Sequence, residues 1–360
     1  MDGITSGTNR EIRVARLRRW WSRCAFLTLS AAVVVVTSEK FYWYPQQFAV
    51  GAFMELVAFY SLPLTLTFVV IDRYRVCGVQ AVGIASAVFA LVVEGVITPV
   101  LYEDGPLPVM ALYFLAWHGY ASFVFGWYLV RRWALAGRRG LLAVAATVQG
   151  ATWGLWSITW WRAESIAEFE AENAAGTGTW DPGQWPTARF AAYAMTASVV
   201  LVVAHRLLDL VWPNDWALTR RWRRALLVVT VMGVALISVA VPWAPLKLAA
   251  LGWPIVVLLR RHRDRTGGST DRVVFAELSG RVRSLDLAPL LLGGPAAIIV
   301  YGTLAALDPS AAFLDGVFWT FAIGQVVIAT GFVATWVRTL RPEPTVGVSG
   351  AGREKRRRVG

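Results

Sequence analysis

The chain has 360 residues, 56% of them hydrophobic, and its mean hydropathy of +0.51 excludes an ordinary soluble domain. Its net charge is +12, and arginine supplies all but three of the 35 basic residues. In so apolar a chain, this basic excess indicates membrane orientation and contact with anionic membrane lipids, and we expect no nucleic-acid partner.

Ten apolar segments follow one another along the chain, and a transmembrane helix needs roughly twenty such residues. They lie at 22–38, 47–71, 77–101, 107–130, 141–161, 189–212, 225–241, 244–259, 288–307 and 312–337. The predicted fold class is therefore all-α, a polytopic transmembrane helix bundle of about ten spans. The seventh and eighth segments are short and are separated by Pro242 and Pro245, so they form either a tight hairpin or a re-entrant pair.

The charges of the connecting loops alternate with the spans. Thirty of the 35 Lys and Arg residues fall on one side of this topology, whereas the loops of the other side hold only Lys40, Arg162, Arg189 and Lys247. Lys and Arg are enriched on the cytoplasmic side of membrane proteins, so we predict that both termini are cytoplasmic. The richness in Arg, Ala, Val and Gly is typical of a bacterial genome, which makes a bacterial cell membrane the expected location.

This topology divides the chain into five parts. They are a basic cytoplasmic N-terminus (1–21), the first five spans (22–161), an extracytoplasmic loop (162–188), the last five spans (189–341) and a disordered basic tail (342–360). The loop at 162–188 is either a solvated connector or a lid or partner-docking segment.

A cytoplasmic segment near 271–285 has an amphipathic pattern. Val274, Leu278, Val282 and Leu285 recur at helical spacing beside arginines. This pattern predicts a helix that lies on the inner surface of the membrane.

Three ionisable residues occur at similar depth in three consecutive spans. Glu55, Glu94 and His118 lie roughly 12, 10 and 16 Å from the outer ends of their helices at the usual helical rise. Consecutive helices with short loops usually pack together, and ionisable residues inside a membrane usually have a function. We therefore predict that the three side chains share one site in the outer half of the membrane.

The chemistry of such a site follows from its low dielectric. Two carboxyl groups cannot both ionise cheaply there, so one is expected to keep its proton, and the imidazole can pass that proton on. The site would suit general acid–base catalysis or proton-coupled transport. The alternative is a hydrogen-bonded pair that only fixes helix packing. Glu, Glu and His are also a possible metal set, but their spacing matches no ligand motif and no fourth ligand is obvious. No haem or flavin fingerprint appears, so no cofactor is predicted.

Further polar and aromatic residues share helix faces with these three. Thr98 and Tyr102 follow Glu94 at four-residue spacing, and Ser122 follows His118 in the same way. The predicted substrate-binding residues are Thr98, Tyr102, Ser122, Gln149, Trp153 and Trp156. The tryptophans could equally be packing residues or anchors at the membrane interface.

A second polar group, His205, Arg206 and Asp209, lies toward the cytoplasmic end of the sixth span. It is interpreted as an interfacial network, with an inner gate or proton exit as the alternative.

Three functions fit these observations. The first is a membrane-embedded enzyme that performs acid–base chemistry, such as isomerisation, cyclisation, hydration or epimerisation, on a hydrophobic or lipid-like substrate. The second is a proton-coupled transporter or exporter, and the third is a non-catalytic subunit with a membrane partner. The chain has no internal repeat, and its polar residues gather in the first half, which favours the enzyme over a transporter.

Overall fold

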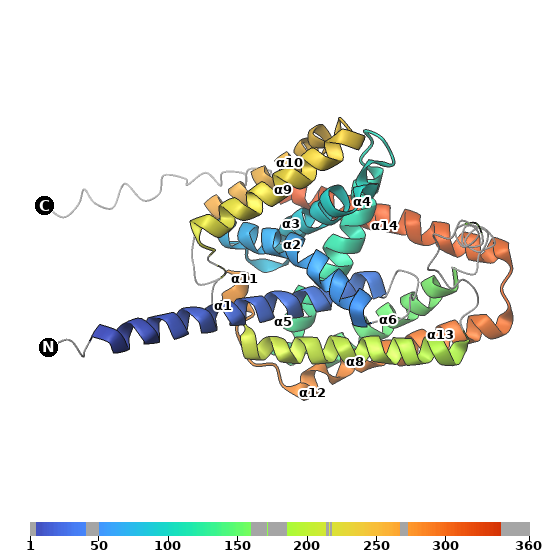
Figure 1. Ribbon diagram of the computed structural model, residues 1–360. Coiled ribbons are helices and arrows are strands. Elements are labelled where there is room, and N and C mark those ends of the chain that lie inside the picture. Colours follow the sequence, from blue (N-terminus) through green and yellow to red (C-terminus); the bar gives the residue numbers. More distant parts are fainter. Residues whose placement is uncertain are drawn as a thin grey trace, which may run out of the picture.

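The computed structural model describes residues 5–40, 50–159, 171, 186–213, 216, 218–266 and 273–339, and every regular element within them is a helix (Figure 1). The predicted all-α helix bundle is thereby confirmed. The predicted loop 162–188 and tail 342–360 lie outside the described residues, except for residue 171 and residues 186–188, where a helix begins.

The helices follow the predicted segments closely. The first half forms α1 (Thr5–Val35), η1 (Val36–Lys40), α2 (Val50–Tyr74), α3 (Gly78–Val92), η2 (Val93–Ile97), η3 (Pro99–Tyr102), α4 (Val109–Phe114), η4 (Leu115–Leu129), α5 (Val130–Leu135) and α6 (Arg139–Ile158). The second half forms α8 (Thr187–Val211), α9 (Arg220–Ala240), α10 (Ala244–Arg265), α11 (Val274–Glu277), α12 (Ser284–Leu287), η6 (Ala288–Leu292), α13 (Gly293–Leu307) and α14 (Ala311–Thr339). The first helix begins well before residue 22, so it extends the first span into the basic N-terminus.

Nine helices among the described residues are long and apolar enough to cross a membrane, and the chain is a multi-pass membrane protein. The remaining predicted segment, 244–259, corresponds to α10. That helix has 22 residues but carries Lys247 near its start and several arginines at its end. Composition alone therefore does not identify it as a span.

Contacts at the two ends of α10 show that this helix crosses the bundle. Near its start, Lys247 Nζ donates a hydrogen bond to the Leu101 carbonyl oxygen at 2.7 Å, in the connection between α3 and α4. Near its end, the Cys77 backbone N–H donates to His262 Nε2 at 3.4 Å, at the α2–α3 junction. Because these contacts lie at opposite ends of α3, α10 traverses the bundle. It forms a hairpin with α9, beside which it lies in Figure 1.

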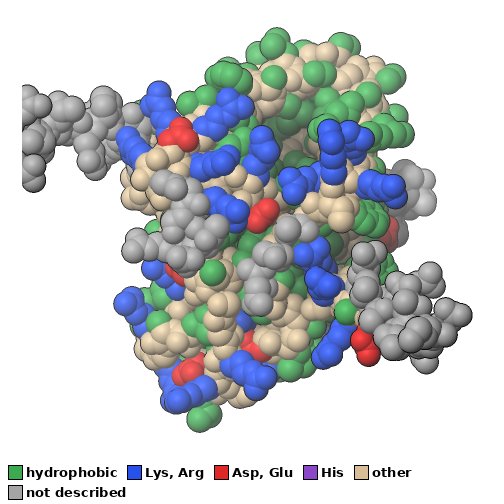
Figure 2. Space-filling view, turned by 90° about the vertical axis from the view of Figure 1, so that its left-hand side faces the viewer, with side chains coloured by type: hydrophobic (Ala, Val, Ile, Leu, Met, Phe, Trp, Pro, Cys, Tyr) green, Lys and Arg blue, Asp and Glu red, His purple; other side chains and the backbone are tan. Residues whose placement is uncertain are grey.

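Several chain connections meet at one end of the bundle. The Val274 N–H donates to the Val76 carbonyl oxygen at 3.0 Å, and Trp212 Nε1 donates to the Phe275 carbonyl oxygen at 2.9 Å. Figure 2 shows this end, where Lys and Arg side chains spread across the face with few Asp and Glu among them. This is the end that the charge pattern predicts to be cytoplasmic.

Cysteine labelling can test this orientation. Ser279 and Ser310 are exposed and lie at opposite ends of the bundle, beside α11 and between α13 and α14. In a variant without Cys24 and Cys77, a membrane-impermeant thiol reagent added to intact cells should label Ser310→Cys but not Ser279→Cys. The reverse pattern, or labelling of both, would contradict the prediction.

Two glycines let α6 and α13 approach each other closely. A Cβ atom added at Gly150 would lie 2.1 Å from the Gly293 carbonyl oxygen, and one at Gly154 would lie 2.3 Å from that of Ala297. Small residues four apart allow this kind of backbone contact between membrane helices.

Alanine at either position should therefore push the two helices apart. We expect Gly150→Ala or Gly154→Ala to lower the free energy of unfolding by about 1–3 kcal/mol, the usual cost of overpacking. Gly316→Ala on α14 is the control, because a Cβ atom there would meet nothing within 4 Å. Thermal unfolding in detergent measures the difference, and equal midpoints for all variants would contradict the close contact.

The segment near 271–285 differs from its prediction. It contains two short helices, α11 and α12, rather than one continuous surface helix. Val274, Leu278 and Val282 are buried within the protein, and only Leu285 is exposed. The apolar residues therefore contact the ends of neighbouring helices instead of lipid.

A buried ion pair holds this segment in place. Arg131 is 1% exposed, and its guanidinium donates to Asp209 Oδ1 at 2.9 Å and to the carbonyl oxygens of Leu278 and Gly280 at 3.0 and 2.8 Å. Asp209 Oδ2 accepts a further bond from Arg206 at 2.7 Å. The predicted interfacial group thus contains Arg206 and Asp209, whereas His205 hydrogen-bonds elsewhere, to the Gly126 carbonyl oxygen at 3.0 Å.

Candidate functional site

Three helices change to π-helical hydrogen bonding where an ionisable side chain lies within the bundle. Glu39 belongs to η1, Glu94 to η2 and His118 to η4. π-Helical turns are rare and are frequently found at functional sites, because they shift side chains away from the regular helical register. The three segments therefore mark a candidate functional region.

Glu94 and His118 are in direct contact, as predicted from their depth. His118 Nε2 lies 2.5 Å from Glu94 Oε1, and the two residues are only 1% and 6% exposed, respectively. Thr98 Oγ1 donates a hydrogen bond to the other carboxylate oxygen at 3.1 Å. Both oxygens of Glu94 thus have a polar partner in a place that excludes water.

The other side of the imidazole faces Tyr60 of α2. The Tyr60 hydroxyl oxygen lies 3.5 Å from His118 Nδ1, and the same hydroxyl donates a hydrogen bond to Glu39 Oε1. Since the Tyr60 proton is directed at Glu39, Nδ1 can only donate toward the tyrosine oxygen. We call the chain Glu39–Tyr60–His118–Glu94 the relay cluster, and its donor order accommodates a doubly protonated imidazole.

Aromatic rings enclose the relay cluster. The rings of Phe89 and Phe114 lie 6.4 and 6.2 Å from the His118 ring, measured between centroids. Such a surrounding keeps the local dielectric low, which strengthens the electrostatic interactions within the cluster.

An apolar cavity of about 400 Å³ adjoins the Phe114 ring, between α3, α4, α10 and α14. Phe114 lines it and also stacks on His118. Apart from Thr330, the remaining lining is apolar and includes Ala90, Leu91, Ile255 and Val333. The cavity therefore comes within one side chain of the His118–Glu94 pair.

Glu55 does not belong to the site, contrary to the prediction. It is exposed on α2, whereas Tyr60, which does reach His118, is buried. Five residues at 100° per residue place the two side chains about 140° apart around the helix. The predicted convergence of Glu55 with Glu94 and His118 is therefore wrong, because Glu55 lies on another face of α2, and the second carboxyl of the cluster is Glu39.

The polar residues predicted to bind substrate beside Glu94 and His118 have separate partners. Thr98 contacts Glu94, as described above. Tyr102 donates to the Gly95 carbonyl oxygen at 2.8 Å, and burial raises the pKa of Tyr102 to about 12, so its hydroxyl stays a neutral donor. Ser122 is buried and donates to the Trp117 carbonyl oxygen at 3.1 Å.

The residues predicted on the fifth span do not line one pocket. Trp153 packs against Phe190 and Tyr193 of α8, and Trp156 packs against Trp117 and Phe318. The two tryptophans therefore face different helices, Trp153 toward α8 and Trp156 toward η4 and α14.

Gln149 lies one turn before Trp153 on α6. Its Nε2 is buried and has no hydrogen-bond partner among the described residues. Trp156 contacts Trp117, whose ring lies 6.2 Å from the His118 ring between centroids.

Glu39 and Tyr60 were not predicted from the sequence. Glu39 follows the last apolar residue of the first predicted span, so the composition around it does not indicate a place within the bundle. Tyr60 shares the buried face of α2 with Val57 and Leu64, and that spacing was the available signal. Among the described residues, no three His, Cys, Asp or Glu side chains are placed to hold a metal ion together.

No family model matches this chain, and no curated protein and no solved structure is significantly similar to it. A functional argument therefore depends on the chemistry of the site, because a helical bundle alone does not define a function.

Proposed function

We propose that this protein is a membrane-embedded enzyme that uses the His118–Glu94 pair for acid–base chemistry on a hydrophobic, lipid-like substrate. The observation that carries the proposal is the buried His118–Glu94 contact of 2.5 Å, one side chain away from an apolar cavity. A positioned imidazole and carboxylate can remove one proton and return another. Isomerisation, cyclisation, hydration and epimerisation are reactions of this class.

The cavity supports the choice of substrate. Its volume of about 400 Å³ and its apolar lining fit part of a hydrocarbon chain, and its walls include no charged side chain. Such a substrate would enter from the lipid, with its reactive end toward Phe114 and the relay cluster.

The rest of the relay cluster would supply protons. Tyr60 and Glu39 lead from His118 toward the end of α1, and Glu39 is only partly buried. A proton lost from the pair during turnover can return along hydroxyl and carboxyl groups in this order. The His118–Glu94 pair is therefore expected to regain its starting protonation after each turnover without a bound cofactor.

Deuterium incorporation tests the proposal even while the substrate is unidentified. Vesicles containing the wild-type protein are incubated in D₂O beside vesicles with Glu94→Gln, and their lipid extracts are compared by mass spectrometry. An enzyme of this class transfers solvent-derived deuterons to carbon or adds D₂O to a double bond. We expect a lipid-soluble species that gains mass only with the wild type and with the exposed control Glu55→Gln. Identical extracts from the wild type, Glu94→Gln and Glu55→Gln would refute the proposed enzymatic function.

A proton-coupled transporter is the second candidate, and a separate observation favours it. The buried Arg131–Asp209 pair and His205 lie toward the opposite end of the bundle from the relay cluster. Proton pathways need ionisable groups at more than one depth. In sealed vesicles, a transporter would accumulate an unmodified substrate and lose that accumulation when the proton gradient collapses, whereas an enzyme converts its substrate without a gradient.

A further inference from the structure

A second hollow lies between α1 and α9, away from the relay cluster. Its volume is about 830 Å³. α9 packs against α10 and against η2, where Gly233 approaches Val96, and no described residue of α9 is buried. The half of α9 near its start therefore faces α1 across an open cleft rather than packing on it.

The two walls of the cleft change from polar to apolar in the same direction. On α1, Arg19 and Arg23 are followed at four-residue spacing by Leu27. On α9, Trp222 is followed by Leu226 and Val229. Arginine and tryptophan at the mouth with aliphatic residues below them match the order of headgroup and acyl chain in a phospholipid.

Trp216 provides an independent observation within the same cleft. It lines the cleft and is 3% exposed, with its ring against Phe26 and Phe68. Its indole N–H is buried and has no hydrogen-bond partner among the described residues. A buried donor without an acceptor is costly, and a phosphate or ester oxygen in the cleft would satisfy it.

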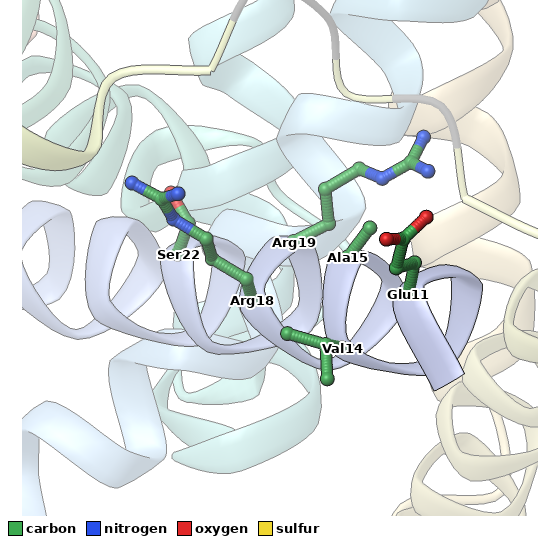
Figure 3. A pocket seen from close by; sticks show the side chains of 6 residues that line it. All are labelled: Glu11, Val14, Ala15, Arg18, Arg19 and Ser22. Atoms are coloured by element: carbon green, nitrogen blue, oxygen red, sulfur yellow. The ribbon is translucent and has the colours of Figure 1, made fainter. Parts of the chain in front are cut away.

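Only some of the neighbouring arginines belong to this site. Figure 3 shows the adjoining hollow on α1, where Arg18 and Arg19 extend in different directions from the helix. Arg18 does not line the cleft, whereas Arg19 and Arg23 do. Among the described residues that line the cleft, the charged ones are Arg19 and Arg23, which lie one turn apart on α1.

We propose that this cleft binds one anionic glycerophospholipid from the leaflet at the arginine-rich end. The phosphate lies between Arg19 and Arg23, the Trp216 N–H donates to a phosphate or ester oxygen, and an acyl chain follows Leu27, Leu226 and Val229. The lipid would fill the space that α9 leaves beside α1. This inference does not depend on the proposed enzymatic function.

Native mass spectrometry of the purified full-length protein tests the site. Phosphatidylglycerol and phosphatidylcholine with identical acyl chains are added separately, and their apparent affinities are compared. We expect phosphatidylglycerol to bind about tenfold more tightly or better, because each arginine near a membrane surface adds to anionic binding. Arg19→Gln with Arg23→Gln should abolish that preference. Trp216→Phe should weaken the binding of both lipids about fivefold, since it removes one hydrogen bond.

The matched control is Arg260→Gln with Arg263→Gln, which removes the same charge from exposed positions at the end of α10. It should leave lipid preference within twofold of the wild type, and unfolding midpoints without lipid identify any variant that fails to fold. The proposal is overturned if the control loses as much preference as the cleft variant, because the effect would then be general surface charge. Displacement of the lipid by excess inorganic phosphate would also overturn it, since that result indicates an ion site.

Discussion

Glu94→Gln is expected to lower turnover of the substrate about a hundredfold or more, while the protein stays folded and inserted. Glutamine keeps the shape of the side chain, and its single amide oxygen can accept from His118 or from Thr98, which contact the two carboxylate oxygens at 2.5 and 3.1 Å, while its NH2 group replaces the other oxygen. It cannot take up or release a proton. Losing one positioned acid or base usually costs a factor of 10² to 10⁴. The measurement is turnover of the deuterium-labelled species per folded molecule.

Two further variants separate the parts of the relay cluster. His118→Gln should lose as much activity as Glu94→Gln, because the two groups act as one pair. Tyr60→Phe removes the hydroxyl between His118 and Glu39 but leaves the His118–Glu94 contact, so a smaller loss is expected. Glu55→Gln is the control, since Glu55 is exposed and lies on another face of α2.

A purely structural role predicts the opposite result. Glu94→Gln would then lower the unfolding midpoint and leave the activity of each folded molecule unchanged. Full activity in both Glu94→Gln and His118→Gln would exclude acid–base chemistry at this pair, in an enzyme or in a transporter. A subunit that serves a catalytic partner would then become the better interpretation.

The helices and the contact between Glu94 and His118 could be predicted from the sequence, because both depend on position along the chain. The ten apolar segments correspond to helices, and α10 shows that loop charge and spacing can identify a helix whose own composition is ambiguous. Glu94 and His118 were placed at matched depth, and they are in contact. Depth follows from counting residues at the helical rise.

Direction around a helix could not be predicted as well. Glu55 is exposed on another face of α2, and the packing of α2 against α3 places Tyr60 beside His118 instead. The π-helical segments add to the difficulty, since they change the register that a regular 3.6-residue period assumes. Ser122 illustrates this, because its hydroxyl donates to the Trp117 carbonyl oxygen five residues earlier.

The partner of an apolar face also could not be predicted. The pattern at Val274, Leu278 and Val282 would suit a lipid surface or a groove in the protein equally well. The structure buries all three at the ends of other helices, with Arg131 bound to the backbone of the same segment. Such a contact between residues about 147 positions apart leaves no local trace in the sequence.

Arg131→Met should destabilise the protein by about 3–5 kcal/mol, the usual cost of removing one partner from a buried ion pair. The change leaves the Asp209 carboxylate with Arg206 and the Val282 N–H, and it deprives the Leu278 and Gly280 carbonyl oxygens of their donor. Thermal unfolding in detergent would measure the loss. Arg132→Met is the adjacent control, because the Arg132–Glu277 pair is 44% and 24% exposed and such pairs contribute at most about 1 kcal/mol.

The double variant Arg131→Met with Asp209→Asn shows why the loss occurs. If the loss of the Arg131 charge beside the Asp209 carboxylate is the main cost, neutralising that carboxylate should restore part of the lost stability, so the two changes would be less than additive. If the carbonyl oxygens of Leu278 and Gly280 dominate instead, the double variant should be as unstable as Arg131→Met or more so. Arg131→Lys tests the geometry, since an ammonium group keeps the charge but cannot reach three acceptors with one planar fork. An Arg131→Met protein as stable as Arg132→Met would show that the buried pair does not hold the 273–287 segment in place.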